Sequence, residues 1–115
     1  MAKSNKPLVW GLFAAGGTVA AFLTPVMIIV TGLAVPLGLM HPEVLAYERI
    51  HALLALWPWK VVMFLFLALS LWHAAHRLRI TAHDFGLRSD TLVATVVYLV
   101  AAFGTIAAAV YLLRI

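Results

Sequence analysis

The sequence predicts an all-α membrane protein that crosses the bilayer three times and forms a single domain over residues 1–115. Hydrophobic residues make up 65% of the chain, charged residues only 10%, and the mean hydropathy is +1.07. A soluble domain of this length cannot bury so much apolar surface. Runs long enough to cross a hydrocarbon layer, which takes about 20 apolar residues, occur at about residues 9–35, 57–80 and 90–113.

The first span combines small residues with an internal proline. Pairs of small residues four positions apart, such as Gly11 with Ala15 and Gly17 with Ala21, let helix backbones approach closely. Pro25 lacks the N–H that would bond back to Ala21, so we expect a kink near the middle of this helix. Because three helices make a thin bundle, such small-residue faces also favour packing against another subunit.

The first loop, residues 36–58, is amphipathic in its second half. Residues 43–56 alternate charged or aromatic groups with leucines, which predicts a short helix lying in the membrane interface. Trp57 and Trp59 then flank Pro58 where an aromatic belt is expected. The acidic and histidine residues of this loop lack metal-ligand spacing, so we interpret it as solvated and expect no metal site.

The basic residues predict the orientation of the spans, and they argue against nucleic-acid binding despite a pI of about 10.0. Cytoplasmic loops carry an excess of Lys and Arg. We therefore expect a cytoplasmic N-terminus and a cytoplasmic second loop. The basic residues on the two sides are Lys3, Lys6, Arg77, Arg79 and Arg88 against Arg49, Lys60 and Arg114.

The second span ends in a cluster of imidazole and guanidinium groups between Trp72 and Asp84. Polar groups at the edge of a bilayer are costly, so they indicate either an anchor to the lipid surface or a site for a polar ligand head. Helical spacing divides them into two neighbouring stripes. The stripes are His73, Arg77 and Asp84 on one side, and His76, Arg79 and His83 on the other.

A quinone fits the chemistry at this end of the span. Trp10 lies at the same side of the membrane, so its indole N–H could converge with His76 and Arg77 on one carbonyl or hydroxyl. A quinone head seeks such donors while its tail needs lipid, and a histidine can accept a proton near neutral pH. The alternative is that Arg77 and Arg79 reach lipid phosphates, which is our interpretation of Arg79.

Cysteine is absent, which removes disulfides, iron–sulfur ligation and covalent c-type haem from consideration. Bis-histidine haem within this chain would need histidines on two spans, and the first and third spans have none. Haem could bind only with a ligand from a partner chain, His73 being the deepest candidate. We expect no haem, metal or flavin in this chain.

Several short motifs together resemble the D-subunit membrane anchor of bacterial menaquinol:fumarate reductase. They follow one another from Trp10 to Asp84, about two-thirds of the chain, and the block beginning at Trp10 is the most specific. The motifs are Trp10-Gly11-Leu12-Phe13-Ala14-Ala15-Gly16-Gly17, Pro25-Val26-Met27, Pro36-Leu37-Gly38-Leu39, Tyr47-Glu48-Arg49, Leu71-Trp72, His76-Arg77 and His83-Asp84.

The resemblance implies a four-subunit complex of the bacterial inner membrane, used in anaerobic fumarate respiration. A second three-helix anchor, an iron–sulfur subunit and a flavoprotein would be the partners. Menaquinol would be held between subunits, with fumarate reduced in the flavoprotein, so this chain would be a non-catalytic part of an oxidoreductase. Trp10, His76 and Arg77 match the family's quinone-site residues, while His83 and Asp84 would serve proton or partner contacts.

Two alternatives differ in function. One is a succinate dehydrogenase-type cytochrome b anchor, for which His73 would be the haem ligand. The other is a structural or assembly membrane protein without a ligand, whose basic helix end binds lipid phosphates.

Overall fold

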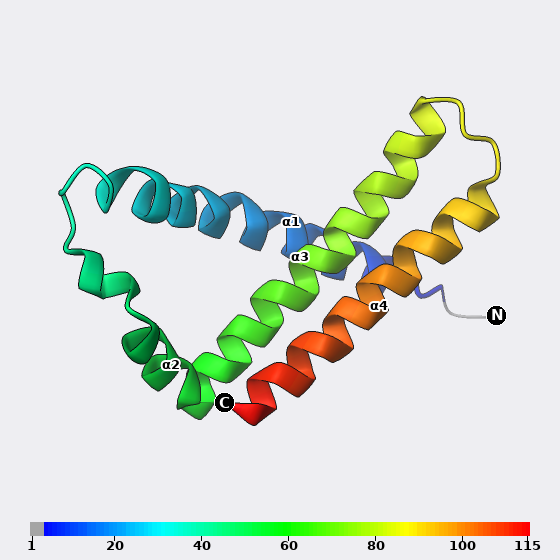
Figure 1. The fold of residues 1–115 in the computed structure, drawn as a ribbon. Coiled ribbons are helices and arrows are strands. Elements are labelled where there is room, and N and C mark those ends of the chain that lie inside the picture. Colours follow the sequence, from blue (N-terminus) through cyan, green and yellow to red (C-terminus); the bar gives the residue numbers. More distant parts are fainter. Residues whose placement is uncertain (1–3) are drawn as a thin grey trace.

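The computed structural model describes residues 4–115, leaving Lys3 outside the described residues, and it is helical throughout its ordered elements (Figure 1). Three helices are long and apolar enough to cross a membrane, over Lys6–Ala34, Trp57–Asp84 and Asp90–Arg114. This confirms the predicted all-α class and the three spans. In chain order the elements are α1 (Lys6–Ile29), η1 (Val30–Ala34), η2 (Pro42–Leu45), α2 (Tyr47–Ala55), α3 (Trp57–Asp84) and α4 (Asp90–Arg114).

Helices α3 and α4 lie side by side as an antiparallel hairpin (Figure 1). Small residues line their contact, since Ala75 is 4% exposed and Ala101 2% exposed. Gly104 faces Leu71, whose Cδ1 would lie 3.0 Å from an added Cβ. Within residues 4–115 the buried positions thus include no large side chain below 2% exposure, and close backbone approach holds the hairpin together.

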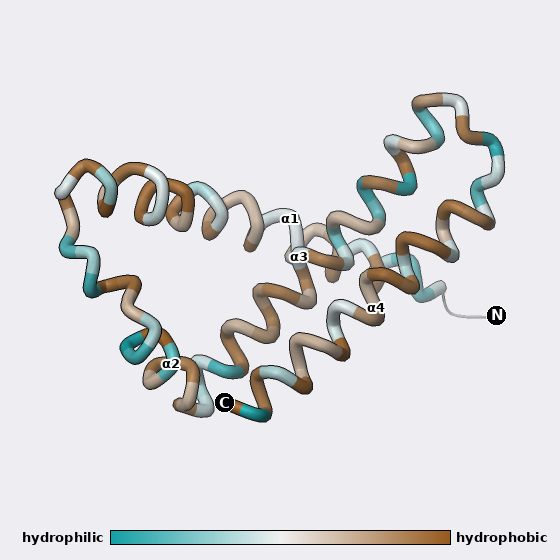
Figure 2. Tube along the Cα trace, in the orientation of Figure 1, coloured by the Kyte–Doolittle hydropathy of each residue, from teal (hydrophilic) through white to brown (hydrophobic). Residues whose placement is uncertain are grey.

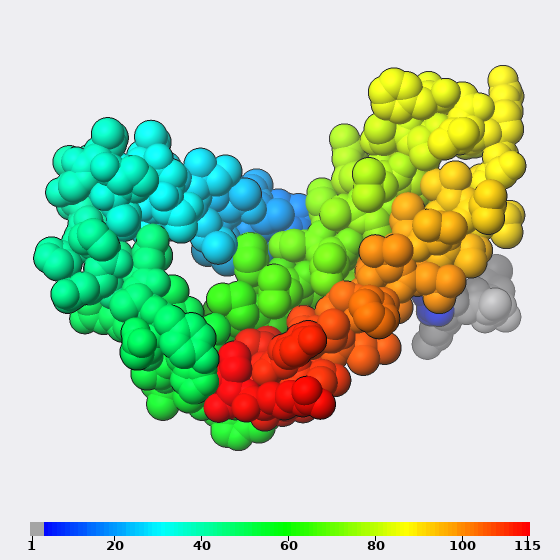
Figure 3. Space-filling view, in the orientation of Figure 1, coloured from blue at the N-terminus to red at the C-terminus, as the bar shows by residue number. Residues whose placement is uncertain are grey.

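Helix α1 crosses α3 instead of running along it. Its N-terminal half lies against α3, whereas its C-terminal half diverges, and Figure 3 shows open space between the two. Gly16 is buried at the crossing. The crossing requires glycine at this position, because an added Cβ would overlap the backbone carbonyl oxygen of Leu69. Gly16 and Gly17 make the contact with α3, whereas a Cβ added at Gly11 would meet nothing within 4 Å.

Glycines end both long helices that lead into loops. Gly38 and Gly86 have φ of 73° and 86°, a left-handed conformation that L side chains rarely adopt. The N–H after each glycine bonds back across the turn, from Leu39 to Ala34 and from Leu87 to Ala82. These are the bonds of a Schellman motif, and they satisfy the last carbonyls of each helix.

Helix α1 continues through Pro25 to Ile29, so the proline does not end it. The departure from α-helical bonding comes one turn later, at η1, where the Val35 N–H bonds to the Val30 carbonyl. Thr31 also donates its hydroxyl proton to the Met27 carbonyl at 2.7 Å. The kink predicted at Pro25 stays a prediction.

The amphipathic segment of the first loop is present but shorter than expected. The sequence predicted one helix over residues 43–56, whereas the structure divides it into η2 and α2. Ala46 causes the division because its backbone is extended, with φ −59° and ψ 139°. Figure 2 shows polar residues gathered around this loop and the tip of the α3–α4 hairpin, with apolar runs between them.

Candidate functional site

An aromatic cluster forms where α1 crosses α3, with the Phe13 ring at its centre. The His73 ring stacks on Phe13 with centroids 4.4 Å apart and 14° between planes. His76 meets the same ring edge-on at 4.6 Å and 65°. Trp10 meets it edge-on at 5.8 Å and 81°. The structure therefore brings Trp10 and His76, both predicted from the sequence, to the ring of Phe13. Phe13 itself was not predicted as a site residue.

His73 packs the two helices together. Its Nδ1 donates to the backbone carbonyl of Phe13 at 3.0 Å, since a carbonyl can only accept. The ring also rests on Gly17, where an added Cβ would lie 2.6 Å from Cε1 and 3.3 Å from Nε2. The imidazole considered as a haem ligand thus lies inside the α1–α3 contact, and residues 4–115 contain no group of three potential metal-ligating side chains.

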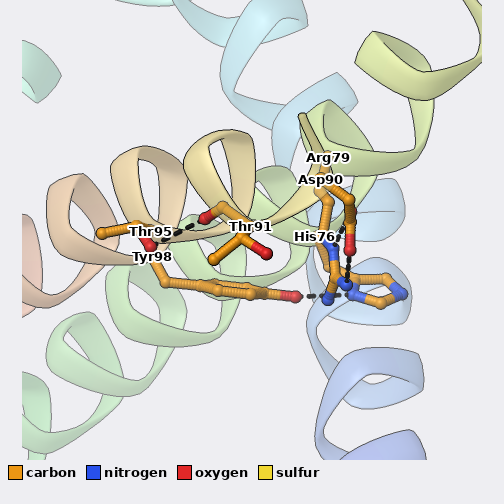
Figure 4. Close-up of polar contacts among 6 residues, drawn as sticks. All are labelled: His76, Arg79, Asp90, Thr91, Thr95 and Tyr98. Atoms are coloured by element: carbon orange, nitrogen blue, oxygen red, sulfur yellow. Dashed lines mark hydrogen bonds and ion pairs between the residues drawn. The ribbon is translucent and has the colours of Figure 1, made fainter. Parts of the chain in front are cut away.

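His76 is joined to the third span. Its Nδ1 lies 2.9 Å from the hydroxyl oxygen of Tyr98 on α4 (Figure 4). The Tyr98 ring stacks on Trp72 with centroids 5.9 Å apart and 22° between planes. The Trp72 indole N–H donates in turn to the Thr105 hydroxyl at 3.1 Å. A line of side chains therefore links α1, α3 and α4 through His76.

The α4 members of this line, Tyr98 and Thr105, were not selected from the sequence, because the family motifs end at Asp84. A signal was present, since polar side chains recur along this span at helical spacing and so share one face. The residues are Thr91, Thr95, Tyr98 and Thr105.

Arg79 on α3 forms a bidentate ion pair with Asp90 on α4. Its Nε donates to Oδ1 at 2.8 Å and its Nη2 to Oδ2 at 2.5 Å (Figure 4). Arg79, which we interpreted as a lipid-phosphate anchor, thus has Asp90 as its partner within this chain. The lipid contact stays a prediction. The pair lines an open groove of about 480 Å³, together with Tyr98, Thr91 and Thr95.

The other predicted polar residues lie outside this network. Arg77, His83 and Asp84 are exposed. Within the described part of the chain none of their side chains forms a hydrogen bond or an ion pair. Arg77 is adjacent to His76 in sequence, but it is not joined to the Phe13 cluster.

Trp72→Phe is expected to weaken the α3–α4 contact, because it removes the indole donor to Thr105 and keeps an aromatic ring beside Tyr98. We expect the free energy of unfolding to fall by about 0.5–1.5 kcal/mol. Thermal unfolding of the purified protein in detergent measures this. Trp59→Phe, in the first turn of the same helix, is the control and should leave the unfolding midpoint in place. Equal loss in both variants would contradict the assignment.

Comparison with known proteins gives a consistent result over the whole chain. The family model described as the D-subunit of fumarate reductase matches residues 1–113. The fumarate reductase D-subunit of Aliivibrio fischeri is 37% identical over 117 aligned residues, covering 98% of this chain and 94% of that protein. Its counterpart in Photobacterium profundum is 44% identical over 82 residues, covering 71% and 68%. The D-subunit of Vibrio parahaemolyticus is 36% identical, covering 98% and 90%.

Proposed function

Because the chain belongs to the D-subunit family of fumarate reductase membrane anchors, we propose that it tethers an iron–sulfur subunit and a flavoprotein to the cytoplasmic face of a bacterial inner membrane. A second three-helix anchor would complete the membrane domain and share a menaquinol site with this chain. Electrons from the quinol would pass to the iron–sulfur subunit. Fumarate would be reduced in the flavoprotein, where this chain supplies no catalytic residue.

The observation that carries the proposed quinol site is the meeting of Trp10 and His76 at Phe13. It joins two helices at one end of the spans and sets an indole N–H and an imidazole around a flat aromatic ring. Aromatic faces and edges pack well against another flat ring such as that of a quinone. Trp10 is 68% exposed, so a ligand from outside this chain can reach its side chain.

Arg77 would supply the cationic donor of the same site. It follows His76 in α3 and is exposed, so its guanidinium can reach a quinone oxygen or a partner subunit. The site is open on this chain, as expected of a pocket whose other walls come from the second anchor and the iron–sulfur subunit. Asp84 and His83, exposed at the end of α3, would contact that subunit or pass protons toward water.

Trp10→Phe and His76→Leu test this assignment in the assembled complex. Each removes one donor, and we expect quinol-driven fumarate reduction to fall about tenfold, which corresponds to about 1.4 kcal/mol. Reduced methyl viologen, which delivers electrons without quinol, measures the amount of working complex. Trp57→Phe is the matched control, because Trp57 is 67% exposed and lies at the opposite end of the spans. Full quinol turnover in both test variants would show that the site lies elsewhere.

The succinate dehydrogenase-type alternative depends on His73 as a haem ligand. A protonated Nδ1 bonded to a carbonyl is the usual arrangement of a metal-binding histidine, and His73 has it. However, its Nε2 lies against Gly17, so α1 would have to move away from α3 before haem could bind. We therefore favour the quinol anchor without haem, and the visible absorption spectrum of the purified, reduced complex distinguishes the two.

A further inference from the structure

Two histidines one helical turn apart on α3 use the same ring nitrogen with different kinds of partner. His73 Nδ1 faces a backbone carbonyl, which is only an acceptor, so Nδ1 is the protonated nitrogen of that ring. His76 Nδ1 faces the Tyr98 hydroxyl, which can donate or accept. The direction of this second hydrogen bond decides which nitrogen of His76 carries the proton.

Arg79 sets that direction. Its guanidinium, which has donors and no acceptor, is held by both carboxylate oxygens of Asp90. Arg79 and Tyr98 line the same groove, and Figure 4 shows the guanidinium close to the Tyr98 hydroxyl. A nearby positive charge favours the orientation in which the hydroxyl oxygen faces the guanidinium and the hydroxyl proton points away from it. The Tyr98 proton is therefore directed toward Nδ1 of His76.

The position of Tyr98 is fixed independently of His76. Its ring stacks on Trp72, and the Trp72 indole is tied to Thr105. Tyr98 is thus held by α3 and α4 packing at one side and by the Arg79–Asp90 pair at the other. Such a preorganised donor can impose one tautomer on a neighbouring imidazole.

We propose that Tyr98, oriented by Arg79 and Asp90, holds His76 in the tautomer with a protonated Nε2, so that His76 is a hydrogen-bond donor to a quinone oxygen. This rests on the proposed quinol site. His73 and His76 then have opposite tautomers, and Tyr98 is a positioning residue. His76 keeps its Nε2 proton throughout, and the protons released by the quinol leave through other groups.

The proposal revises the expectation that a histidine here accepts the quinol proton. A neutral imidazole whose Nε2 is protonated has no lone pair at that nitrogen, so it cannot act there as a base. As a donor it stabilises negative charge that develops on the quinone oxygen during electron transfer. His76 would therefore contribute to quinone binding and to stabilising the one-electron intermediate.

Comparing the His76→Gln and His76→Leu variants tests whether His76 acts as a hydrogen-bond donor or as a base. A glutamine amide donates a hydrogen bond but does not take a proton at neutral pH. We expect the glutamine variant of the complex to keep at least about one third of its quinol-driven turnover, and the leucine variant to lose about tenfold. Equal losses in the two variants would overturn the donor role.

Tyr98→Phe tests the positioning role, with Tyr111→Phe as its matched control. Tyr111 lies on the same helix and is 67% exposed. Tyr98→Phe should raise the KM for quinol about fivefold to tenfold and leave the viologen-driven rate unchanged. Tyr111→Phe should leave the KM for quinol unchanged. Nitrogen-15 NMR of the histidine-labelled complex in bilayers identifies the His76 signals by their loss in His76→Gln. These signals should show a protonated Nε2 and a bare Nδ1, and a protonated Nδ1 would overturn the proposal.

The outcomes also separate this inference from the function on which it rests. If Trp10→Phe and His76→Leu keep full turnover, the quinol site itself is wrong. If those variants are slow but Tyr98→Phe behaves like Tyr111→Phe, the site stands and only the role of Tyr98 fails.

Discussion

Gly16→Ala is expected to separate α1 from α3 and to destabilise the assembled membrane domain. The added Cβ would overlap the carbonyl oxygen of Leu69 and lie 3.0 Å from Cβ of His73. The first of these is backbone, which cannot rotate away as a side chain would. Overpacking of this kind costs about 1–3 kcal/mol, and here the whole crossing must shift to relieve it. The unfolding midpoint of the detergent-purified complex and its yield both measure the effect.

Gly11→Ala is the matched control for this change. Gly11 lies on the same helix, one turn and a half before Gly16, and an added Cβ would meet nothing within 4 Å. Because alanine favours helix over glycine by about 1 kcal/mol, this variant should be neutral or slightly stabilising. If the two variants behave alike, α1 does not cross α3 at Gly16.

Reversing either charge of the Arg79–Asp90 pair is the second change with a large expected effect. Arg79→Asp places two carboxylates where α3 meets α4, and Asp90→Arg places two guanidinium groups there. Like charges at this distance repel, and the donors and acceptors that met in the pair lose their partners. We expect each single variant to lower the amount of assembled complex in membranes several-fold.

The double variant, Arg79→Asp with Asp90→Arg, tests whether the pair itself is responsible. It restores opposite charges across the hairpin, so the level of complex should recover most of the way toward that of the unaltered protein. Such recovery is the non-additivity expected of two residues in contact. If the double variant is as poor as the sum of the singles, each residue acts through some other contact. Quantitative blotting of membrane fractions measures all three variants.

Local signals were sufficient for the spans and for part of the site. Trp10, His76 and Arg77 were selected because a donor near the bilayer edge is costly, and two of them do meet at one ring. The ring that joins them, Phe13, carried no signal because an apolar residue in an apolar helix is expected. Arg79 was assigned to lipid because its partner Asp90 belongs to a different helix.

The amphipathic loop shows the same limit at a smaller scale. Composition predicted one helix over residues 43–56, and a helix is present in its second part. The extended backbone at Ala46 divides it, although alanine is the strongest helix former. The intrinsic helix preference of a single alanine therefore does not decide its backbone conformation here.

The sequence alone determined that this chain is a three-span helical membrane protein. Hydropathy is summed along consecutive residues, so it can be evaluated without knowing which residues are in contact in the folded chain. The family motifs determined its membership in the same way. Only the tertiary structure decided that His73 packs two helices while His76 contacts Tyr98. Two imidazoles one turn apart are chemically identical in sequence. Their tautomers depend on which atom of another helix lies within about 3 Å, and that distance is set by helix crossing and rotation.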